Sequence, residues 1–348
     1  MAEVKIGNKW IGDNKPCFII AEAGVNHNGD VNLAKRLIDV AKRAGADAVK
    51  FQTFRAENVV TANAGKANYQ KETTGNGESQ LEMLKKLELA ERDFGELFTY
   101  SREKGVIFLS SPFDKESADL LDELGVPAFK IASGEITNFP LLKHVARKKK
   151  LIILSTGMST LGEIEEALGV LRKEGAEEII LLHCVSCYPA ASEDINLRAM
   201  DTLRRAFKLP VGLSDHTLGI AIPIAAVALG ACVIEKHFTL DRYFPGPDHR
   251  VSLEPGELKH MVKAIRDVEK ALGDGVKKPA EEEKENKELV RRSLVAKVDI
   301  AEGTMLAEEM LDIKRPAGGI EPKYIGLVVG RRAKKDIAKD SLIMWEEV

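Results

Sequence analysis

The sequence lacks the features of a disulfide-stabilised protein, a membrane protein or a protein that binds nucleic acid in bulk. Only 4 of its 348 residues are cysteines, too few for a disulfide framework. No apolar run approaches the roughly 18 residues of a membrane span, and the opening stretch MAEVKIGNKWIGDNK has no apolar signal region. The 51 basic and 54 acidic residues nearly cancel. We therefore expect a cytoplasmic protein that binds neither membranes nor nucleic acid.

Aromatic residues are also scarce, at 5%, whereas 44% of the chain is hydrophobic. This composition is typical of a soluble globular protein of about two domains. Cys184 and Cys187 form a Cys-x-x-Cys pair, which could indicate redox chemistry or half of a zinc site. Because there is no second pair and no helical pattern directly after this one, we interpret both cysteines as small buried residues at a strand end.

The chain instead shows a regular alternation of short apolar runs and amphipathic helical patterns. Continuous apolar strands separated by helices are typical of a parallel sheet covered on both faces. Eight repeats predict a (β/α)8 barrel over residues 1–275. A doubly wound open sheet is the alternative, but AEAGVNHNGD follows the first run where a Gly-rich phosphate fingerprint would stand. The eight runs are 18–24, 48–54, 106–111, 128–133, 151–156, 178–184, 211–215 and 232–238.

The pattern changes after residue 275. A charged stretch follows, and we interpret residues 276–290 as a linker with some helix. Within residues 291–348, AKVDIAEGTML (296–306) and AKKDIAKDSLI (333–343) are partial copies of each other, each with a polar turn between apolar segments. The repeat predicts a small, pseudo-symmetric β domain.

Ser214, Asp215 and His216 stand side by side at the end of the seventh run and are the residue types of a hydrolase triad. Neighbouring residues on a strand point to opposite faces, so three consecutive side chains cannot hydrogen-bond in series. The pattern therefore disfavours a nucleophilic triad. A metal site, an anion site or a plain turn remains.

Polar residues follow most of the eight runs, and the active site of a (β/α)8 barrel lies at the C-terminal ends of its strands. Burying a lysine without a partner is costly, so Lys50 and Lys130 imply a bound anion or paired carboxylates. Two lysines with several hydroxyls suit a phosphate. His216 and His237 end neighbouring strands of the predicted barrel, so they could share one divalent metal ion or have separate structural roles.

These residues lie in motifs that closely resemble the sialic acid synthase family. The resemblance spans nearly the whole chain, and the region after residue 291, with KRPAGGIEP (314–322), resembles the antifreeze-like SAF domain appended to these enzymes. The barrel motifs are AEAGVNHNGD (21–30), GADAVKFQTF (45–54), FLSSPFD (108–114), FKIASGEITNFPLL (129–142), LSTGMST (154–160), LLHCVSCYP (181–189), GLSDHTLG (212–219), EKHFTLDR (235–242) and GPDH (246–249).

The resemblance implies a metal-dependent condensation of phosphoenolpyruvate (PEP) and water with an unphosphorylated N-acetylmannosamine-type sugar, giving a nonulosonic acid and phosphate. It implies a domain-swapped homodimer in which Arg315 enters the partner's barrel. Given this chemistry, Glu22 and Glu135 are candidates for handling water and protons. The resemblance makes His216 and His237 ligands of Mn2+, with Mg2+ or Co2+ as alternatives. It assigns PEP to Lys50, Ser111, Lys130, Ser133, Ser155 and Ser214, and the sugar to Gln52, Asn76, Tyr188, Asp248 and Arg315.

Several functions stay open at this point. N-acetylmannosamine, giving N-acetylneuraminate, is the favoured sugar, and 2,4-diacetamido-2,4,6-trideoxymannose, giving legionaminate, is the alternative. A synthase acting on a phosphorylated pentose or tetrose aldehyde is disfavoured because such relatives usually lack the SAF domain. A non-catalytic carbohydrate- or ice-binding protein is disfavoured by the lysines and histidines at the strand ends.

Overall fold

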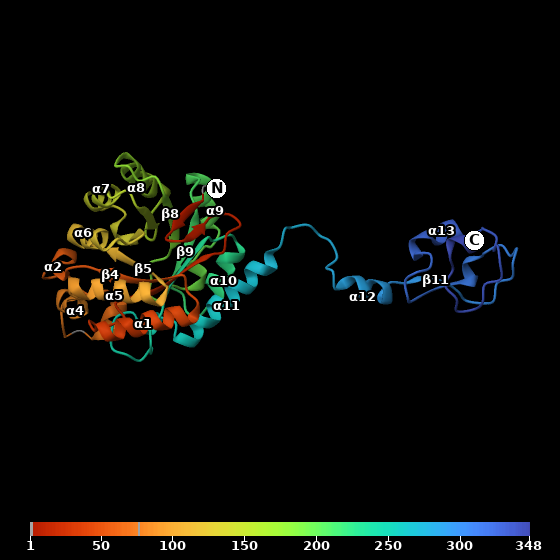
Figure 1. Ribbon diagram of the computed structural model, residues 1–348, viewed down its shortest axis with the longest axis horizontal. Coiled ribbons are helices and arrows are strands. Elements are labelled where there is room, and N and C mark those ends of the chain that lie inside the picture. Colours follow the sequence, from red (N-terminus) through yellow and green to blue (C-terminus); the bar gives the residue numbers. More distant parts are fainter. Residues whose placement is uncertain (1–2, 76) are drawn as a thin grey trace. The chain divides into compact units, whose positions relative to one another are not determined.

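The structure is a computed structural model that describes residues 3–75 and 77–348. It divides the chain into two compact units, Met1–Gly273 and Asp274–Val348 (Figure 1). No helix within the described ranges has the length and apolar character needed to cross a membrane.

The first unit is built around eight parallel strands that follow one another in the order β5-β4-β3-β10-β9-β8-β7-β6. Strands β5 and β6, at the two ends of this order, are in contact, so the sheet curls into a barrel. The fold prediction is therefore confirmed, and each strand falls on one of the eight apolar runs. The strands are β3 (Phe18–Gly24), β4 (Ala48–Thr53), β5 (Ile107–Pro112), β6 (Ala128–Ile131), β7 (Leu151–Ser155), β8 (Ile179–Cys184), β9 (Val211–Asp215) and β10 (Val233–His237).

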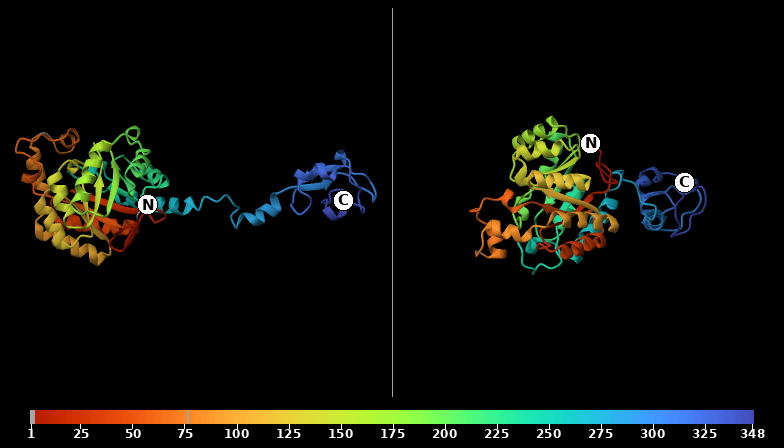
Figure 2. Two further views of the ribbon diagram at one scale, coloured as in Figure 1. Left: turned by 90° about the horizontal axis from the view of Figure 1, so that it is seen from above. Right: turned by 60° about the vertical axis from the view of Figure 1, so that its left-hand side comes forward.

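Helices surround the strands on the outside of the barrel (Figures 1 and 2). The first of them begins at an N-cap, Asp30, whose side chain accepts a hydrogen bond from Asn32 N–H, and ends at Gly45, whose φ of 86° is left-handed. The helices of this unit are α1 (Val31–Ala44), α2 (Ala56–Val59), α3 (Asn68–Thr74), α4 (Gln80–Leu87), α5 (Glu91–Lys104), α6 (Lys115–Leu124), α7 (Phe139–Ala146), α8 (Leu161–Lys173), α9 (Ala199–Phe207), α10 (Ala221–Ala228) and α11 (Pro255–Leu272).

The N-terminal ends of the strands are closed by a hairpin that the sequence analysis did not predict. Its strands, β1 (Val4–Ile6) and β2 (Lys9–Ile11), pair antiparallel. Their buried side chains join the apolar cluster formed by the first residues of the barrel strands, including Phe18 and Val233. The polar groups of the barrel interior therefore lie at its other end, where the strands finish.

The second unit contains the repeat seen in the sequence. The backbone groups of Ile300 and Ile337 exchange two hydrogen bonds, of 2.9 and 2.8 Å. Asp299 accepts a bond from Lys339 N–H, and Asp336 accepts the equivalent bond from Glu302 N–H. These reciprocal bonds are those expected of a pseudo-symmetric pair. The elements of this unit are α12 (Glu283–Val290), which lies in the predicted linker, β11 (Ser293–Ala296), β12 (Leu311–Lys314) and α13 (Ile325–Val328).

Candidate active site

Four charged side chains meet inside the barrel at the C-terminal ends of its strands. The ammonium of Lys50 lies 2.5 Å from Glu22 and 3.7 Å from Glu235, and that of Lys130 lies 3.2 Å from Glu235. None of the four residues is more than 4% exposed. The structure thus shows one of the two arrangements expected for buried lysines, pairing with carboxylates in a cluster sheltered from water.

Hydroxyl groups surround this cluster. Ser111 accepts a hydrogen bond of 3.1 Å from Lys50, and Ser214 donates one of 2.9 Å to Glu235. The hydroxyl of Ser133 accepts a bond from the N–H of Gly157, two residues after β7. Ser155 is buried, and its hydroxyl has no hydrogen-bond partner. All six predicted PEP residues therefore lie at the strand ends, four of them linked through Glu235 and Glu22, with an unsatisfied hydroxyl among them.

The two carboxylates of the cluster differ in their affinity for protons. Burial raises the pKa of Glu22 to about 7, despite the opposing charge of Lys50. Burial would raise the pKa of Glu235 as well, but Lys130 and Lys50 outweigh it and hold this pKa at about 2. At neutral pH Glu235 is therefore ionised, whereas Glu22 readily gains or loses a proton, as an acid or base must.

The other carboxylate predicted for proton transfer, Glu135, lies on the turn after β6 and has no hydrogen bond or ion pair with this cluster. Glu135 ends a short 3-10 turn after β6 and accepts a hydrogen bond of 2.7 Å from Asn138. Its side chain is half-buried, and burial raises its pKa. The structure thus joins Glu22 to the lysines and leaves Glu135 outside the network.

His216 and His237 lie side by side, with ring centroids 5.5 Å apart. Nδ1 of His216 is 2.8 Å from the carbonyl oxygen of Val185, to which it donates when protonated, and its Nε2 then keeps a free lone pair. Nδ1 of His237 is buried and has no hydrogen-bond partner. Burial also lowers the pKa of His237 well below its ordinary value, so the ring is neutral. Two imidazoles with available nitrogens fit a divalent metal ion.

Two histidines supply only part of the coordination shell that a divalent ion takes. Within residues 3–75 and 77–348, no group of three or more His, Cys, Asp or Glu side chains is arranged to hold a metal ion. An ion at His216 and His237 would therefore complete its coordination with water or with substrate oxygens.

Three of the predicted sugar-side residues converge on the same region. Tyr188 packs against His216, at a centroid distance of 4.2 Å. Asp248 is buried, which raises its pKa to about 6 against the influence of His216. Gln52 donates a long hydrogen bond of 3.4 Å to Glu22. Arg315 is exposed on the second unit, and Asn76 lies outside the described residues.

The loop that carries Asp248 is tied to the turn after β3. The side-chain amide of Asn26 donates to the carbonyl of Phe238 at 2.8 Å and to the hydroxyl of Ser252 at 2.9 Å. Ser252 in turn donates to the backbone carbonyl of Asp248. The motif AEAGVNHNGD therefore holds the loop at one side of the barrel mouth in place.

Two residues of this region were not predicted to have a role, and one prediction about a third was wrong. Glu235 was given no role, although it shares its face of β10 with His237, two residues on. Tyr69 stacks on Tyr188 at 5.1 Å and lies in a segment without a clear periodic pattern. Cys187 is exposed, so the prediction that both cysteines are buried is wrong for this one and right for Cys184.

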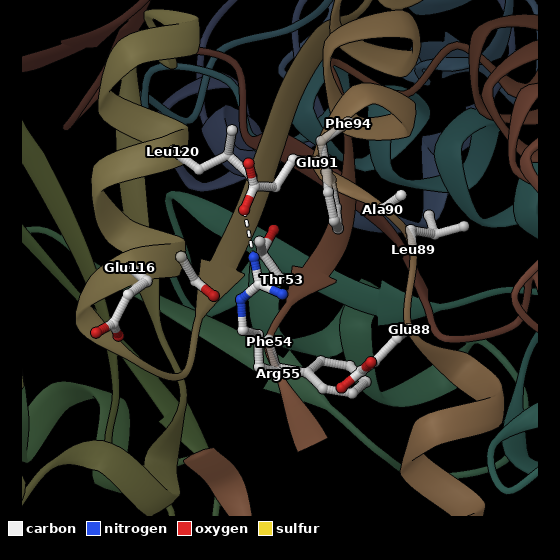
Figure 3. Close-up of a pocket in the computed structure, with 11 residues that line it drawn as sticks. Thr53, Phe54, Arg55, Glu88, Leu89, Ala90, Glu91, Phe94, Glu116 and Leu120 are labelled. Carbon is white, nitrogen blue, oxygen red and sulfur yellow. Dashed lines mark hydrogen bonds and ion pairs between the residues drawn. The ribbon is translucent and has the colours of Figure 1, made fainter. Parts of the chain in front are cut away.

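A separate pocket lies beside α5 and α6 (Figure 3). It includes Arg55 and Glu91, which form an ion pair with each other, and Glu88, which accepts a hydrogen bond from the N–H of Ala56. These polar groups already have partners. None of the predicted site residues lines this pocket, so the candidate active site is the charged cluster inside the barrel.

The chain is a (β/α)8 barrel whose polar side chains gather at the C-terminal ends of the eight parallel strands, where enzymes of this fold have their active sites. The chain belongs to the NeuB family, whose model matches residues 37–277, and a SAF domain matches residues 291–348. Both findings confirm the resemblance seen in the sequence.

Individual relatives cover nearly the whole chain. It is 56% identical over 331 residues to the N,N'-diacetyllegionaminic acid synthase of Campylobacter jejuni, covering 94% of this chain and 99% of that protein. It is 48% identical over 346 residues to the Legionella pneumophila protein of that name, covering 98% and 97%. The crystal structure of the Leptospira borgpetersenii N-acetylneuraminic acid (sialic acid) synthetase in complex with citrate matches with a TM-score of 0.72 and 41% identity, covering 82% and 95%.

Proposed function

We propose that this protein is a nonulosonic acid synthase that condenses PEP with an amino sugar and water and releases phosphate. The observation that carries the proposal is the buried pair Lys50 and Lys130, ringed by hydroxyls at the active end of the barrel. A substrate with a phosphate and a carboxylate supplies the anionic oxygens that two ammonium groups and several hydroxyls bind. Membership of the NeuB family supports this choice of substrate.

In the proposed complex, PEP takes the place of carboxylate oxygens beside the lysines. Glu22 loses the stabilising contact with Lys50 when the substrate oxygens replace it. Its pKa of about 7 makes protonation of Glu22 the least costly adjustment, because Glu235 has the much lower pKa of about 2. PEP binding should therefore be coupled to proton uptake at Glu22.

The proposed reaction has three bond changes. C3 of PEP attacks the aldehyde carbon of the open-chain sugar, water adds at C2, and the bond between C2 and the phosphate oxygen breaks. Lys50 and Lys130 hold PEP, while Glu22 and Glu135 move protons to and from water. A divalent ion held by His216 and His237, for which we favour Mn2+ over Mg2+ or Co2+, would supply Lewis acidity at the aldehyde oxygen.

For the sugar, we propose 2,4-diacetamido-2,4,6-trideoxymannose, which gives N,N'-diacetyllegionaminate. From the sequence alone, N-acetylmannosamine was the favoured sugar. The identities of 56% and 48% to two N,N'-diacetyllegionaminic acid synthases, against 41% to a sialic acid synthetase, move the proposal to the diacetamido sugar. N-acetylmannosamine remains the second candidate.

Phosphate release from PEP tests both the proposed reaction and the proposed sugar. We expect Mn2+-dependent release that EDTA abolishes, with kcat/KM for 2,4-diacetamido-2,4,6-trideoxymannose at least about tenfold above that for N-acetylmannosamine. N-acetylmannosamine 6-phosphate should be a poor substrate. The reverse preference would make the protein an N-acetylneuraminate synthase, and no release with any amino sugar would contradict the proposed reaction.

We further propose that the active form is a homodimer in which Arg315 reaches the sugar in the partner's barrel. The turn that presents Arg315 is held in shape, because Ser293 donates a hydrogen bond of 2.9 Å to the carbonyl of Pro316 and accepts one of 3.1 Å from Gly319. A guanidinium exposed on a fixed turn is suited to bind a substrate across an interface.

Replacing Arg315 by alanine should raise KM for the sugar about tenfold to a hundredfold, since a hydrogen bond to a charged group contributes about 1.5–3 kcal/mol. KM for PEP should change by less than about twofold. The matched control is Arg332→Ala, which removes an exposed guanidinium bonded to the carbonyl of Gly303. Equal losses for the two substrates would count against the assignment, and sedimentation should show a dimer for both variants.

A further inference from the structure

The residues that neighbour the two histidines in the sequence form a buried ion pair on the outer face of the barrel wall. The ammonium of Lys236 lies 2.5 Å from a carboxylate oxygen of Asp215, and both side chains are fully buried, at 0% exposure. The two residues are direct partners in the pairing of β10 with β9. Successive residues of a strand point to opposite faces. The pair therefore sits behind the wall from which His216 and His237 face inward.

This ion pair also holds the backbone that follows His216. The carboxylate of Asp215 accepts a bond of 3.1 Å from the N–H of Thr217 and one of 3.0 Å from its hydroxyl. Lys236 donates to the carbonyl oxygen of Thr217. The N–H, hydroxyl and carbonyl of Thr217 are thus all bonded to the pair, and His216 is fixed between two anchored residues.

Stability alone does not explain charges at this place. The same outward positions one pair earlier along the two strands are apolar, Leu213 on β9 and Ile234 on β10, and both belong to the main apolar core. A buried ion pair is often no more stabilising than well-packed apolar side chains of similar volume, because both ions lose their hydration. What the charged pair adds is a defined geometry at the ends of β9 and β10.

We propose that Asp215 and Lys236 are positioning residues that set the separation and orientation of His216 and His237 as a metal-binding pair. The inference rests on the proposed function, because it takes the two histidines to be metal ligands. With the Asp215–Lys236 ion pair intact, the two imidazoles are preorganised for one ion. Without it, the turn after β9 gains freedom, and metal binding must order it again.

The variant that isolates this role is Asp215→Leu/Lys236→Met, which removes both charges and keeps the site apolar. We expect its melting temperature to stay within a few degrees of the wild type or to rise. The dissociation constant for Mn2+, measured from the electron paramagnetic resonance signal of free Mn2+, should increase at least about tenfold. Lys236→Arg, which keeps a cation beside Asp215, should recover part of this loss.

Two controls separate positioning from general destabilisation. Arg266→Met breaks another ion pair of the barrel unit, in which the guanidinium of Arg266 lies 2.8 Å from the carboxylate of Asp47. This variant should have a lower melting temperature and an unchanged affinity for Mn2+. If the double variant fails to fold, Asp215→Asn is measured instead; it leaves Lys236 without its partner and should lower the melting temperature, so its affinity for Mn2+ is compared with that of Arg266→Met.

A folded double variant that binds Mn2+ within about twofold of the wild type would overturn the inference. That result would leave the proposed function intact. If the wild type itself binds no Mn2+, or if His237→Ala binds it equally well, the assignment of the metal site is refuted, and so is the inference that rests on it.

Discussion

Replacing His237 by alanine is expected to abolish Mn2+ binding and to lower the rate of PEP-dependent phosphate release by roughly a thousandfold or more. His237 has a buried Nδ1 without a hydrogen-bond partner, and its ring is held neutral by burial. Alanine removes one of the two histidine ligands, so only His216 is left, and a single imidazole seldom retains a divalent ion. Titration with Mn2+ and a phosphate-release assay in the same buffer measure both effects.

The matched control is His144→Ala on the outer helix α7, where the imidazole lies 2.7 Å from Asp119. This change removes a histidine of the same barrel and should alter neither Mn2+ binding nor turnover. PEP binding to the His237→Ala variant should persist in the presence of EDTA, since the lysines are untouched. Full activity in His237→Ala would refute the metal assignment.

Strand positions could be predicted because each barrel strand is buried on both faces and therefore appears as a continuous apolar run. Polar residues at the ends of these runs stand out for the same reason, as Lys50 and Lys130 do. The N-terminal hairpin was not predicted, since its strands, Val4–Ile6 and Lys9–Ile11, are too short to show a period.

The difference in pKa between the two buried carboxylates could not be predicted from the residue types. Glu22 and Glu235 are the same amino acid, yet one has a pKa of about 7 and the other of about 2. The difference arises because Glu235 lies near both lysines, whereas Glu22 is paired mainly with Lys50. Such distances depend on which strands become neighbours, and only the closed barrel sets them.

The ion pair behind the histidines, Asp215–Lys236, likewise depends on which strands are neighbours. Asp215 and Lys236 are 21 residues apart in sequence, and each looks like part of a polar strand end. Their contact follows from the register of β9 against β10, which pairs these two residues directly. The sequence indicates that a site is present, and the register decides which polar residues face into it and which support it from behind.

A second large effect is expected for Lys130→Met. PEP binding should be lost, with kcat/KM reduced by roughly a thousandfold or more, because one of the two buried cations that hold the substrate is gone. The variant should also be less stable by about 3–5 kcal/mol at neutral pH, since Glu235 keeps its charge but loses its nearest cation. Isothermal titration with PEP and denaturant unfolding measure the two losses.

The stability loss should depend on pH in a defined direction. In the wild type the pKa of Glu235 is held at about 2, below its ordinary value of 4.5, so its ion pairs stabilise the fold above pH 4.5 and are lost as the pH falls towards 2. Without Lys130 this pKa rises, and protonated Glu235 no longer needs a cation. The difference in unfolding free energy between wild type and variant should therefore shrink as the pH falls below the raised pKa of Glu235 in the variant, and should keep shrinking towards about pH 2.

The double variant Lys130→Met/Glu235→Gln separates the structural role of Lys130 from its role in binding. It removes one charge of each sign, so the cluster stays neutral with Lys50 and Glu22 still paired at 2.5 Å. Glutamine can still accept the hydrogen bond from Ser214. Stability at neutral pH should therefore recover most of the loss, while PEP binding should not recover at all. Restored PEP affinity in the double variant would show that Lys130 serves only to balance Glu235, and the anion site would then have to be assigned to Lys50 alone.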